Sequence, residues 1–369
     1  MKWKTHEENW RVIKSFLPKG WQEQAKELGA LTRQRKVKNA SDLLRVLLIH
    51  VADGCSLRET AARGRQGRIS DISDVALLKR LKGSSEWFRW MAMQLLRRRG
   101  IGLKKPSWLS GYNVRSVDAS TVSEPGSTGT DWRLHYSLEL FGLRCDQFIL
   151  TEPNVGESFK NFDMGRDDLI IGDRAYGRLQ GLWHVRRKGG EFLVRLRNKA
   201  FPLYNPKSGK NFHLLPQLRK SKVGQAGEWM VEARGKKHPP LPMRLCVVRK
   251  SKAAAEEAIK RARREMRKQE TIDPETLELH RFVILATSLP SKNVSAYLVT
   301  ELYRIRWQIE IAFKRLKSIM GLGHLPKSDA ASCRAWLHGK LFVALLVQAI
   351  IDEGRFFSPW GYRLNGRAS

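Results

Sequence analysis

The sequence lacks the residue groupings that hold structural zinc or build a disulfide framework. Only four cysteines occur among 369 residues, and no two of them form a Cys-x-x-Cys pair. The nine histidines are scattered, with no His-x-x-x-His pair. Because zinc sites and disulfide scaffolds depend on such groupings, the composition disfavours both and fits a reducing cytoplasm. Any metal would have to bind carboxylates, which favours magnesium or manganese.

Long apolar segments are also missing. The longest candidate runs from Leu341 to Ile351, and it is shorter than the roughly 20 residues that a helix needs to span a bilayer. The first residues, Met1 to His6, lack the apolar segment of a signal peptide. We therefore expect no membrane association and a cytoplasmic location.

Negative charge is scarce relative to positive charge. Lys and Arg number 68 against 36 Asp and Glu, which gives a formal net charge of +32. Self-repulsion of this size indicates a polyanionic partner, and nucleic acid is the first candidate. A basic membrane-surface protein is an alternative, but no apolar segment supports it. A basic RNA-binding or ribosome-associated protein would also account for the charge.

What the sequence does contain begins with a helical part, predicted for residues 1 to about 105. The apolar-periodic run 43–51 ends before Gly54, and Ser56 and Glu59 have the spacing of a capping box. Helix, glycine-containing turn and short helix is the pattern of a helix-turn-helix, although a plain helical hairpin fits equally well. Three arginines beyond the short helix favour DNA contact: Arg63, Arg65 and Arg68.

From about residue 111 the pattern changes to short strands. Strands are predicted at 114–119, 132–140, 145–151, 168–173 and 192–196, with a helix at 175–188 between the last two. This order is the one expected of a ribonuclease-H-like α/β core. Strand-like pieces and a charged helix, Ala253 to Glu270, then interrupt it between residues 198 and 280. For that helix, a solvated surface role is favoured over contact with the DNA backbone.

These patterns predict an α/β protein, with a ribonuclease-H-like catalytic core and a β-rich insertion, preceded by an all-helical N-terminal domain. Helices near 73–82 and 84–99 and a linker at 100–108 end the helical part, and a return strand at 282–287 follows the insertion. The expected divisions are 1–108 for a helical DNA-binding domain, 109–197 for the first part of the core, 198–280 for the insertion domain, and 281–369 for the second part of the core with a Glu-bearing helix and a C-terminal helix.

The most informative segment is the helix predicted from about residue 302 to 320. At about 100° per residue, four of its polar side chains fall within roughly 60° of one another: Tyr303, Arg306, Glu310 and Lys317. Apolar residues form an adjacent stripe that would pack on a core. A carboxylate that binds a divalent cation, beside cations that hold phosphates, is what chemistry on a phosphodiester requires. The alternative is an ordinary helix with solvent-facing charges.

Two aspartates lie in the predicted strands. Asp118 lies within the strand 114–119, and Asp173 ends the strand 168–173. Groups at the carboxyl ends of strands in α/β sheets face the functional crevice, and a buried charge without a partner is costly. Together with Glu310, the two aspartates can hold two divalent ions about 3.5–4 Å apart. Taken singly, Asp118 would be an ordinary strand-end acid.

The four polar residues of the helix follow the spacing Tyr-x2-Arg-x3-Glu-x6-Lys without a gap. On this motif the chain resembles an insertion-sequence transposase of the DDE class, and more narrowly the group named after insertion sequence 4. Residues 172–177 (Gly-Asp-Arg-Ala-Tyr-Gly) match the family's second-aspartate motif, and residues 117–121 (Val-Asp-Ala-Ser-Thr) match its first. The resemblance covers about residues 40–350 and implies a ribonuclease-H-like core with a β-rich insertion between the second Asp and the Glu.

The resemblance also assigns roles to individual residues. It implies a catalytic triad that binds two Mg²⁺ or Mn²⁺ ions: Asp118, Asp173 and Glu310. It implies three residues that grip phosphates near the scissile bond: Tyr303, Arg306 and Lys317. Two more would assist in contacting DNA: Arg174, and Trp307 by stacking on a base. A packing role fits Trp307 equally well.

The implied function is cut-and-paste transposition by a DNA transposase. Hydrolysis at the element's end frees a 3′-hydroxyl, which then attacks the opposite strand or target DNA. The implied partners are double-stranded DNA, as terminal inverted repeats and as target, and a second copy of the chain in a homodimer assembled on DNA at the nucleoid. The alternative is a catalytically inactive DNA-binding relic of a mobile element. A basic RNA-binding protein would account for the charge but not for the three carboxylates.

Overall fold

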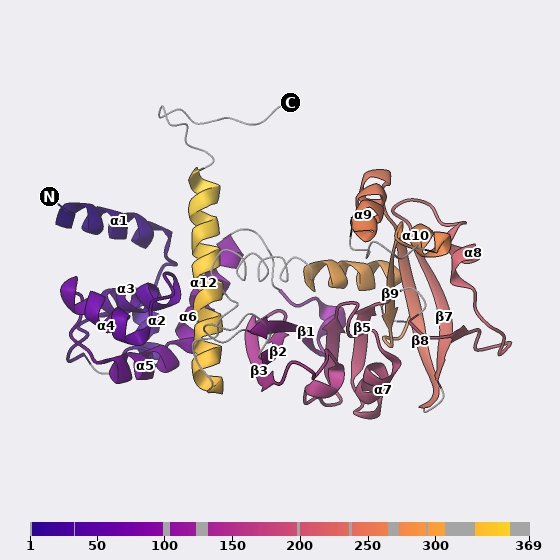
Figure 1. Cartoon of the computed structure of the whole chain (residues 1–369), viewed down its shortest axis with the longest axis horizontal. Coiled ribbons are helices and arrows are strands. Elements are labelled where there is room, and N and C mark those ends of the chain that lie inside the picture. The colour runs from indigo at the N-terminus through magenta and orange to yellow at the C-terminus, as the bar shows by residue number, and fades with distance from the viewer. Residues whose placement is uncertain are drawn as a thin grey trace.

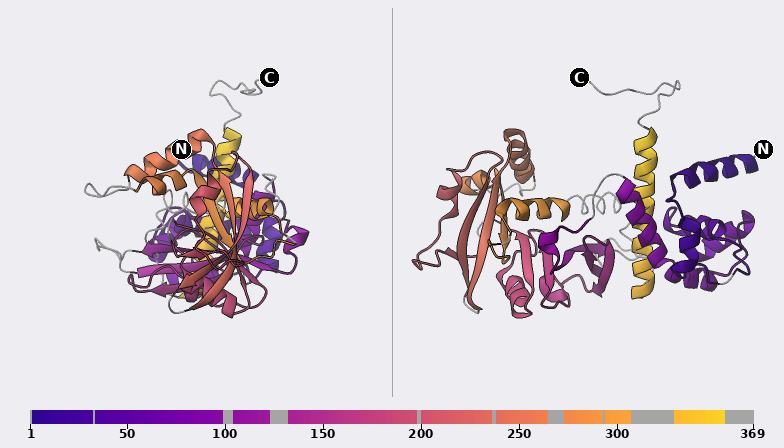
Figure 2. Two further views of the ribbon diagram at one scale, coloured as in Figure 1. Left: turned by 90° about the vertical axis from the view of Figure 1, so that its right-hand side faces the viewer. Right: turned by 180° about the vertical axis from the view of Figure 1, so that it is seen from behind.

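The computed structural model describes residues 2–32, 34–98, 104–122, 132–197, 200–235, 238–264, 273–292, 294–306 and 329–354. Within these ranges, a group of N-terminal helices lies at one end of the molecule and a large mixed sheet at the other, with a long C-terminal helix between them (Figure 1). The view from behind shows the same arrangement (Figure 2).

The N-terminal part is helical, as the sequence predicts. Its described helices are α1 (Lys2–Phe16), α2 (Trp21–Glu27), α3 (Ala40–Val51), α4 (Leu57–Gln66), α5 (Asp74–Gly83) and α6 (Ser85–Arg98). A short polar side chain caps the start of α3, α4 and α5, because each accepts a hydrogen bond from a backbone N–H in the first turn: Asn39 from Asp42, Ser56 from Glu59 and Ser73 from Ala76. The predicted capping residue at Ser56 is therefore confirmed.

One detail of this region differs from the expectation. Helix α4 continues to Gln66, so Arg63 and Arg65 lie on the helix rather than beyond it. The helix continues because Ala61 and its neighbours pack inward while the arginine side chains stay at the surface. Arg68 follows in a left-handed conformation with φ of 53°.

The described strands form one mixed sheet. They are β1 (Asn113–Val122), β2 (Trp132–Glu139), β3 (Arg144–Thr151), β4 (Asp168–Gly172), β5 (Glu191–Arg195), β6 (Leu203–Tyr204), β7 (Ala226–Gly235), β8 (His238–Arg249) and β9 (Phe282–Thr287). Their order is β3-β2-β1-β4-β5-β9-β8-β7-β6. β1, β2 and β3 are antiparallel, whereas β4 and β5 run parallel to β1. The strands predicted between 114 and 196 and at 282–287 are thus present, with small shifts at their ends.

Residues 203–249 add strands to the same sheet. β9 joins the two halves, because Ala286 pairs with Val194 of β5 on one side and with Leu245 of β8 on the other. The described helices of this outer part are α8 (Leu214–Leu218), α9 (Lys252–Arg264) and α10 (Pro274–Leu279). α9 stands away from the sheet and buries only Ala255 among its residues.

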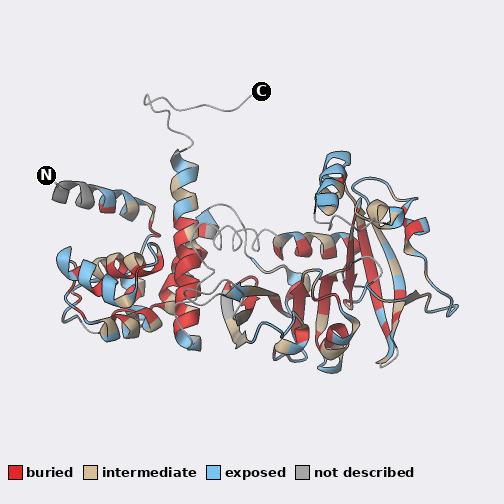
Figure 3. Ribbon diagram, viewed as in Figure 1, coloured by how far each residue is buried: buried red, intermediate tan, exposed pale blue. Residues whose placement is uncertain are grey.

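Both faces of the sheet are covered by apolar side chains. On one face, a core that includes Val117 and Phe192 packs against α7 (Leu179–Arg187). On the other, a core that includes Val114 and Leu193 packs against helical residues 296–306. Buried positions accordingly follow the middle of the strands (Figure 3). α7 begins later than the predicted start at Ala175, for a reason given with the site below.

The C-terminal helix α12 (Ala330–Gly354) packs against α6 and shares its core with the N-terminal helices. Phe342 stacks on Phe88 with ring centroids 5.9 Å apart. The apolar run that starts at Leu341 is therefore part of a longer helix, and the length of that helix was underestimated from the sequence. Within the described part of the chain, Ala331–Ile351 is the one segment long and apolar enough to cross a membrane, with a mean hydropathy of 1.4. This is weak evidence for a membrane span, because 61% of the most apolar part of this segment is buried inside the protein. Core helices of soluble proteins can be equally long and apolar.

Candidate active site

The two predicted aspartates lie side by side at one edge of the sheet. In the parallel pairing of β1 with β4, Ser116 is opposite Ile171, so two residues further along Asp118 is opposite Asp173. In the pairing of β4 with β5, Gly172 is opposite Val194, which places Asp173 opposite Arg195. Neighbouring strands are about 4.8 Å apart. β1 and the carboxyl ends of β4 and β5 therefore carry two carboxylates and a guanidinium on three neighbouring strands.

These three side chains also share a face of the sheet. Alternate residues of a strand point to the same side, and one core contains residues from β1, β4, β5 and helical residues 296–306: Val114, Ile171, Leu193, Val299 and Leu302. Counting in steps of two from these positions, Asp118, Asp173 and Arg195 lie on that same face. The helix at 296–306 therefore covers the side of the sheet that carries the candidate site, as its place along the strand ends in Figure 1 shows.

Two hydrogen bonds from described residues hold Asp118. One carboxylate oxygen accepts from the backbone N–H of Ala119 at 2.9 Å, and the other accepts from the Tyr136 hydroxyl at 3.0 Å. Tyr136 is the cross-strand partner of Asp118 on β2 and is 5% exposed. The tyrosine thus fixes the orientation of a half-buried carboxylate. Sequence reasoning missed Tyr136, because its role depends on the register of β1 and β2.

Asp173 is placed by a tight turn after β4. Its side chain accepts a hydrogen bond from the backbone N–H of Ala175 at 2.8 Å, which holds residues 173–177 in a turn and delays the start of α7. Gly172 is required before it, because a Cβ there would lie 2.7 Å from Cβ of Tyr176 and 2.9 Å from the Phe159 ring. This close packing positions the aspartate at the end of the strand.

Tyr176 lies beneath the two aspartates. Its ring packs against Phe159, with centroids 5.1 Å apart. Burial raises the pKa of Tyr176 well above its usual value, and the negative charges of Asp118, Glu157 and Asp173 raise it further. The charges of these three carboxylates therefore act on the Tyr176 side chain. Glu157, in the loop before Phe159, was not among the residues predicted from the sequence.

The donor set fits divalent cations. Two half-buried carboxylates meet here, and the buried Tyr176 hydroxyl has no hydrogen-bond partner within the described residues. Carboxylate oxygens are the ligands that magnesium and manganese prefer. Within the described ranges, no three His, Cys, Asp or Glu residues are grouped closely enough to hold a metal. The third predicted ligand, Glu310, lies outside the described residues, as do Trp307 and Lys317.

Tyr303 and Arg306 face the same way, as their spacing predicts. A guanidinium nitrogen of Arg306 donates to the Tyr303 hydroxyl at 3.2 Å, and the guanidinium carbon lies 4.7 Å from the centre of the ring. Both side chains are buried. The contact holds the cation in one orientation at the covered face of the sheet.

Further cations gather beside Asp173. Burial lowers the pKa of Arg195, and the charges of Arg174 and Arg306 lower it further, whereas Tyr303 and Asp173 oppose this shift. Arg195 therefore lies among the predicted DNA-contacting residues. Its position could not be read from the sequence, because it follows from the pairing of β5 with β4. Arg174 itself is exposed in the turn after Asp173.

The arginines of the expected helix-turn-helix are balanced by acids at the surface. Arg63 pairs with Glu59 at 2.7 Å, and Arg65 pairs with Asp71 at 2.8 Å. All four side chains are about half exposed or more. Such exposed pairs contribute little to stability. The structure thus places these cations on an accessible helix without bringing them near the aspartates.

Comparison with known proteins identifies the family of the chain. Residues 155–346 match the family described as transposase DDE domain. InsL of insertion sequence element IS186A from Escherichia coli (strain K12) is 33% identical over 95% of this chain and 96% of its own length. The transposase for insertion sequence element IS421 from Escherichia coli is also 33% identical, with the same coverage. The transposase for insertion sequence element IS231B from Bacillus thuringiensis subsp. berliner is 24% identical over 93% of this chain and 79% of its own length.

The similarity covers almost the whole chain and includes the segment that carries Asp173 and its turn. Enzymes of this family depend on divalent metal, which the paired carboxylates fit. The relatives are enzymes that cleave DNA and transfer strands, and a strongly basic chain suits a DNA partner. The chain therefore belongs to the DDE-domain transposase family and is a DNA transposase.

Proposed function

We propose that this transposase cuts the ends of an insertion sequence and joins them to target DNA at a site made of Asp118, Asp173 and Glu310. The observation that supports the proposal most strongly is the strand register that sets Asp118 beside Asp173, with Arg195 next in line. Two carboxylates on neighbouring parallel strands, with cations nearby, match the needs of phosphoryl transfer.

We propose a ribonuclease-H-like core for this enzyme. The order β3-β2-β1-β4-β5, with three antiparallel strands followed by two parallel ones, supports it. The Tyr-x2-Arg-x3-Glu-x6-Lys spacing supports membership of the insertion sequence 4 group. In this proposal residues 1–108 recognise the element's ends, residues 198–280 form the insertion within the core, and residues 109–197 and 281–369 complete the core.

The side chains divide the work between holding metal and holding DNA. Asp118, Asp173 and Glu310 would hold Mg²⁺ or Mn²⁺, as two ions. Such ions, when bound, lower the pKa of an attacking water and stabilise the leaving oxygen. Five residues would bind and orient phosphates around the scissile bond: Tyr303, Arg306, Lys317, Arg174 and Arg195. Trp307 would stack on a base.

The partners follow from the same chemistry. The enzyme would bind terminal inverted repeats and target DNA, and would act as a homodimer assembled on DNA in the cytoplasm, at the nucleoid. The net charge of +32 supports strong attraction to a polyanion.

The proposal is tested by substituting the carboxylates in the full chain. Asp118→Asn and Asp173→Asn should each lower cleavage of a duplex carrying the element's terminal repeat by roughly three orders of magnitude or more. Binding of that duplex should stay within a few-fold of wild type in fluorescence anisotropy, because an amide keeps the shape of the site. Cleavage that survives either substitution, or that requires zinc instead of Mg²⁺ or Mn²⁺, would refute the assignment.

A further inference from the structure

The sheet edge that carries the aspartates continues into a basic region. β9 is antiparallel to both β5 and β8, so β5 and β8 run in the same direction and end at the same edge. β8 ends at Arg249, which is opposite Phe282 at the start of β9. Lys250 follows directly, and α9 starts at Lys252. From Asp118 on β1, this edge therefore runs past the ends of β4, β5 and β8 to the start of α9.

Positive charges crowd along that line. The Lys250 ammonium donates to the backbone oxygen of His280 at 2.8 Å. Burial lowers the pKa of Lys250 to about 8, and the neighbouring charges of Arg195, Arg174 and Arg261 contribute to the shift. Arg195 belongs to the candidate site and Arg261 belongs to α9, so the charges of both act on Lys250, which follows β8 and precedes α9 in the chain. Like charges held this close together are costly unless an anion binds to them.

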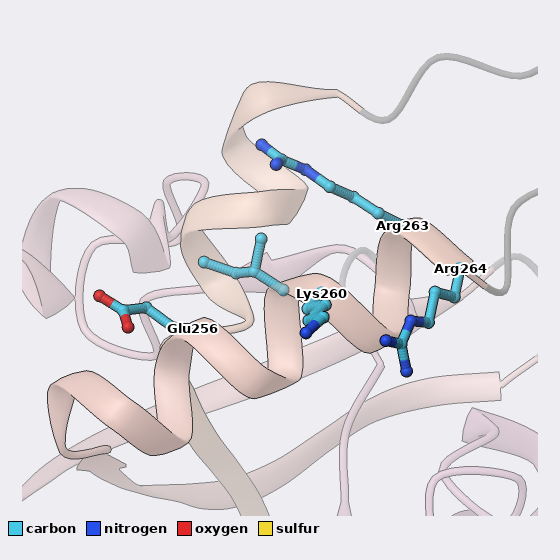
Figure 4. A pocket seen from close by; sticks show the side chains of 5 residues that line it. Glu256, Lys260, Arg263 and Arg264 are labelled. Atoms are coloured by element: carbon cyan, nitrogen blue, oxygen red, sulfur yellow. The ribbon is translucent and has the colours of Figure 1, made fainter.

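The second half of α9 is exposed and strongly cationic. Lys260, Arg263 and Arg264 spread around a shallow hollow of about 500 Å³, and Glu256 is the one acidic side chain among its described lining residues (Figure 4). No ion pair joins the cations at 260, 261, 263 and 264 to any acid in the described part of the chain. The arginines of α4 differ, because Arg63 and Arg65 are each paired with an acid. Basic residues favour helix C-termini, but that preference does not require them to line the same edge as the aspartates.

The position of α9 indicates which DNA it would meet. The N-terminal helices lie beyond β3 at one end of the sheet, and α9 lies above β7, β8 and β9 toward the other end (Figure 1). The aspartates lie between them, on β1 and at the end of β4. A duplex bound by the N-terminal helices and cut at the aspartates would therefore reach α9 only on the far side of the cut.

We propose that Lys250 and the cationic half of α9, residues 260–264, bind the phosphate backbone of the duplex that flanks the element. This inference rests on the proposed function. The flank differs from one insertion to the next, so its contacts must ignore sequence, and lysine and arginine contacts to phosphate do so. The surface binds flanking DNA before cleavage and adds affinity without adding sequence preference.

The test compares two duplexes made from the genomic DNA around this gene. One carries the terminal repeat with about 20 base pairs of flank, and the other ends at the cut. The variant is the double substitution Arg261→Gln and Arg263→Gln in the full chain. The matched control is Lys207→Gln and Lys210→Gln, which removes the same charge from an exposed loop after β6. Binding is measured by fluorescence anisotropy over a range of salt concentrations.

The α9 variant should bind the flanked duplex at least about tenfold more weakly near 0.1 M salt, with a log–log salt slope smaller by about one to two. Its affinity for the duplex without flank should equal that of wild type, and the control should match wild type on both. Equal losses on both duplexes, or no loss on the flanked one, would overturn the inference. If wild type itself does not prefer its own repeat to random duplex, the proposed function fails instead.

Discussion

Two parts of one sheet edge carry opposite chemistry. β1 and the end of β4 present Asp118 and Asp173, whereas the ends of β5 and β8 present Arg195 and Lys250. The backbone geometry is alike in both parts, because all four strands run in the same direction. The two parts of the edge therefore differ in residue type and not in backbone geometry. Acidic residues make one part a reacting centre, and basic residues make the other a surface that binds a polyanion. Substitutions in only one of the two parts test whether cleavage and DNA binding are separated in this way.

The largest effect after loss of a carboxylate is expected from Gly172→Ala, in the acidic part. The added methyl group meets Tyr176 at 2.7 Å, so the turn must shift and carry Asp173 away. A displacement on the order of 1 Å can cost roughly 100-fold in rate, and overpacking costs about 1–3 kcal/mol in the free energy of unfolding. Single-turnover cleavage and thermal unfolding check these values. Gly156→Ala is the control, since a Cβ there has nothing within 4 Å; equal activity of both variants would contradict the account.

Arg306→Gln and Lys317→Gln test the two cations that the motif spacing assigns to phosphate binding. Each should lower the log–log salt slope of end binding by about one, which is roughly tenfold in affinity near 0.1 M salt. Cleavage should fall further than binding, because a displaced phosphate misses the carboxylates. Filter binding and single-turnover cleavage on the same duplex give both values. An unchanged slope in both variants would favour ordinary surface charge.

Tyr136→Phe removes the hydroxyl that orients Asp118. A hydrogen bond to a charged group contributes about 1.5–3 kcal/mol, so cleavage at limiting Mg²⁺ should fall by roughly tenfold and recover in part at saturating Mg²⁺. Tyr112→Phe, which removes the same atom just before β1, should leave the Mg²⁺ requirement unchanged. Identical Mg²⁺ titrations for Tyr136→Phe and wild type would assign Tyr136 to packing alone.

The smallest effect concerns pH and the basic part of the edge. The Lys250 pKa of about 8 lies below its ordinary value of 10.5, so the folded protein loses this charge as pH rises through 8. Raising the pH from 7 to 9 should lower the salt slope of flanked-duplex binding by at most about one. Lys250→Met should show no such pH dependence. Without DNA, Lys250 is neutral in the folded protein but still protonated in the unfolded chain between pH 8 and 10.5. The contribution of Lys250 to the free energy of unfolding should therefore rise with pH across that window. A pH response that survives in Lys250→Met would assign the effect to another group.

The sequence allowed the local elements of this edge to be predicted. The apolar segment that becomes β4 is short and ends at Asp173, so an aspartate at a strand end could be expected from hydrophobicity alone. The starts of α3, α4 and α5 follow from local side-chain caps, which depend on residues only two or three positions apart. The spacing of Tyr303 and Arg306 predicted their contact, because residues three apart on a helix are neighbours.

The remaining features depend on contacts between distant segments. Tyr136 donates to Asp118, and Arg195 lies on the strand next to the one that ends before Asp173, only because particular strands are neighbours in a particular register. Nothing in the order of residues shows that β9 lies between β5 and β8, so Lys250 could not be placed near the site. The packing of α12 on the N-terminal helices is likewise a long-range contact that periodicity does not reveal.

We propose that Asp118 and Asp173 hold the metal that drives DNA cleavage, and a change of ligand atom at these two positions separates metal binding from other roles. Asp118→Cys and Asp173→Cys replace a hard carboxylate with a softer thiolate, which Mg²⁺ binds poorly and Mn²⁺ tolerates better. Single-turnover cleavage of end DNA should be abolished for both variants in Mg²⁺ and restored by at least about tenfold in Mn²⁺, while Asp→Ala at the same positions stays inactive in both ions. Loss of activity that Mn²⁺ does not relieve in either cysteine variant, in an assay where wild type uses both ions, would contradict the assignment of these aspartates as metal ligands.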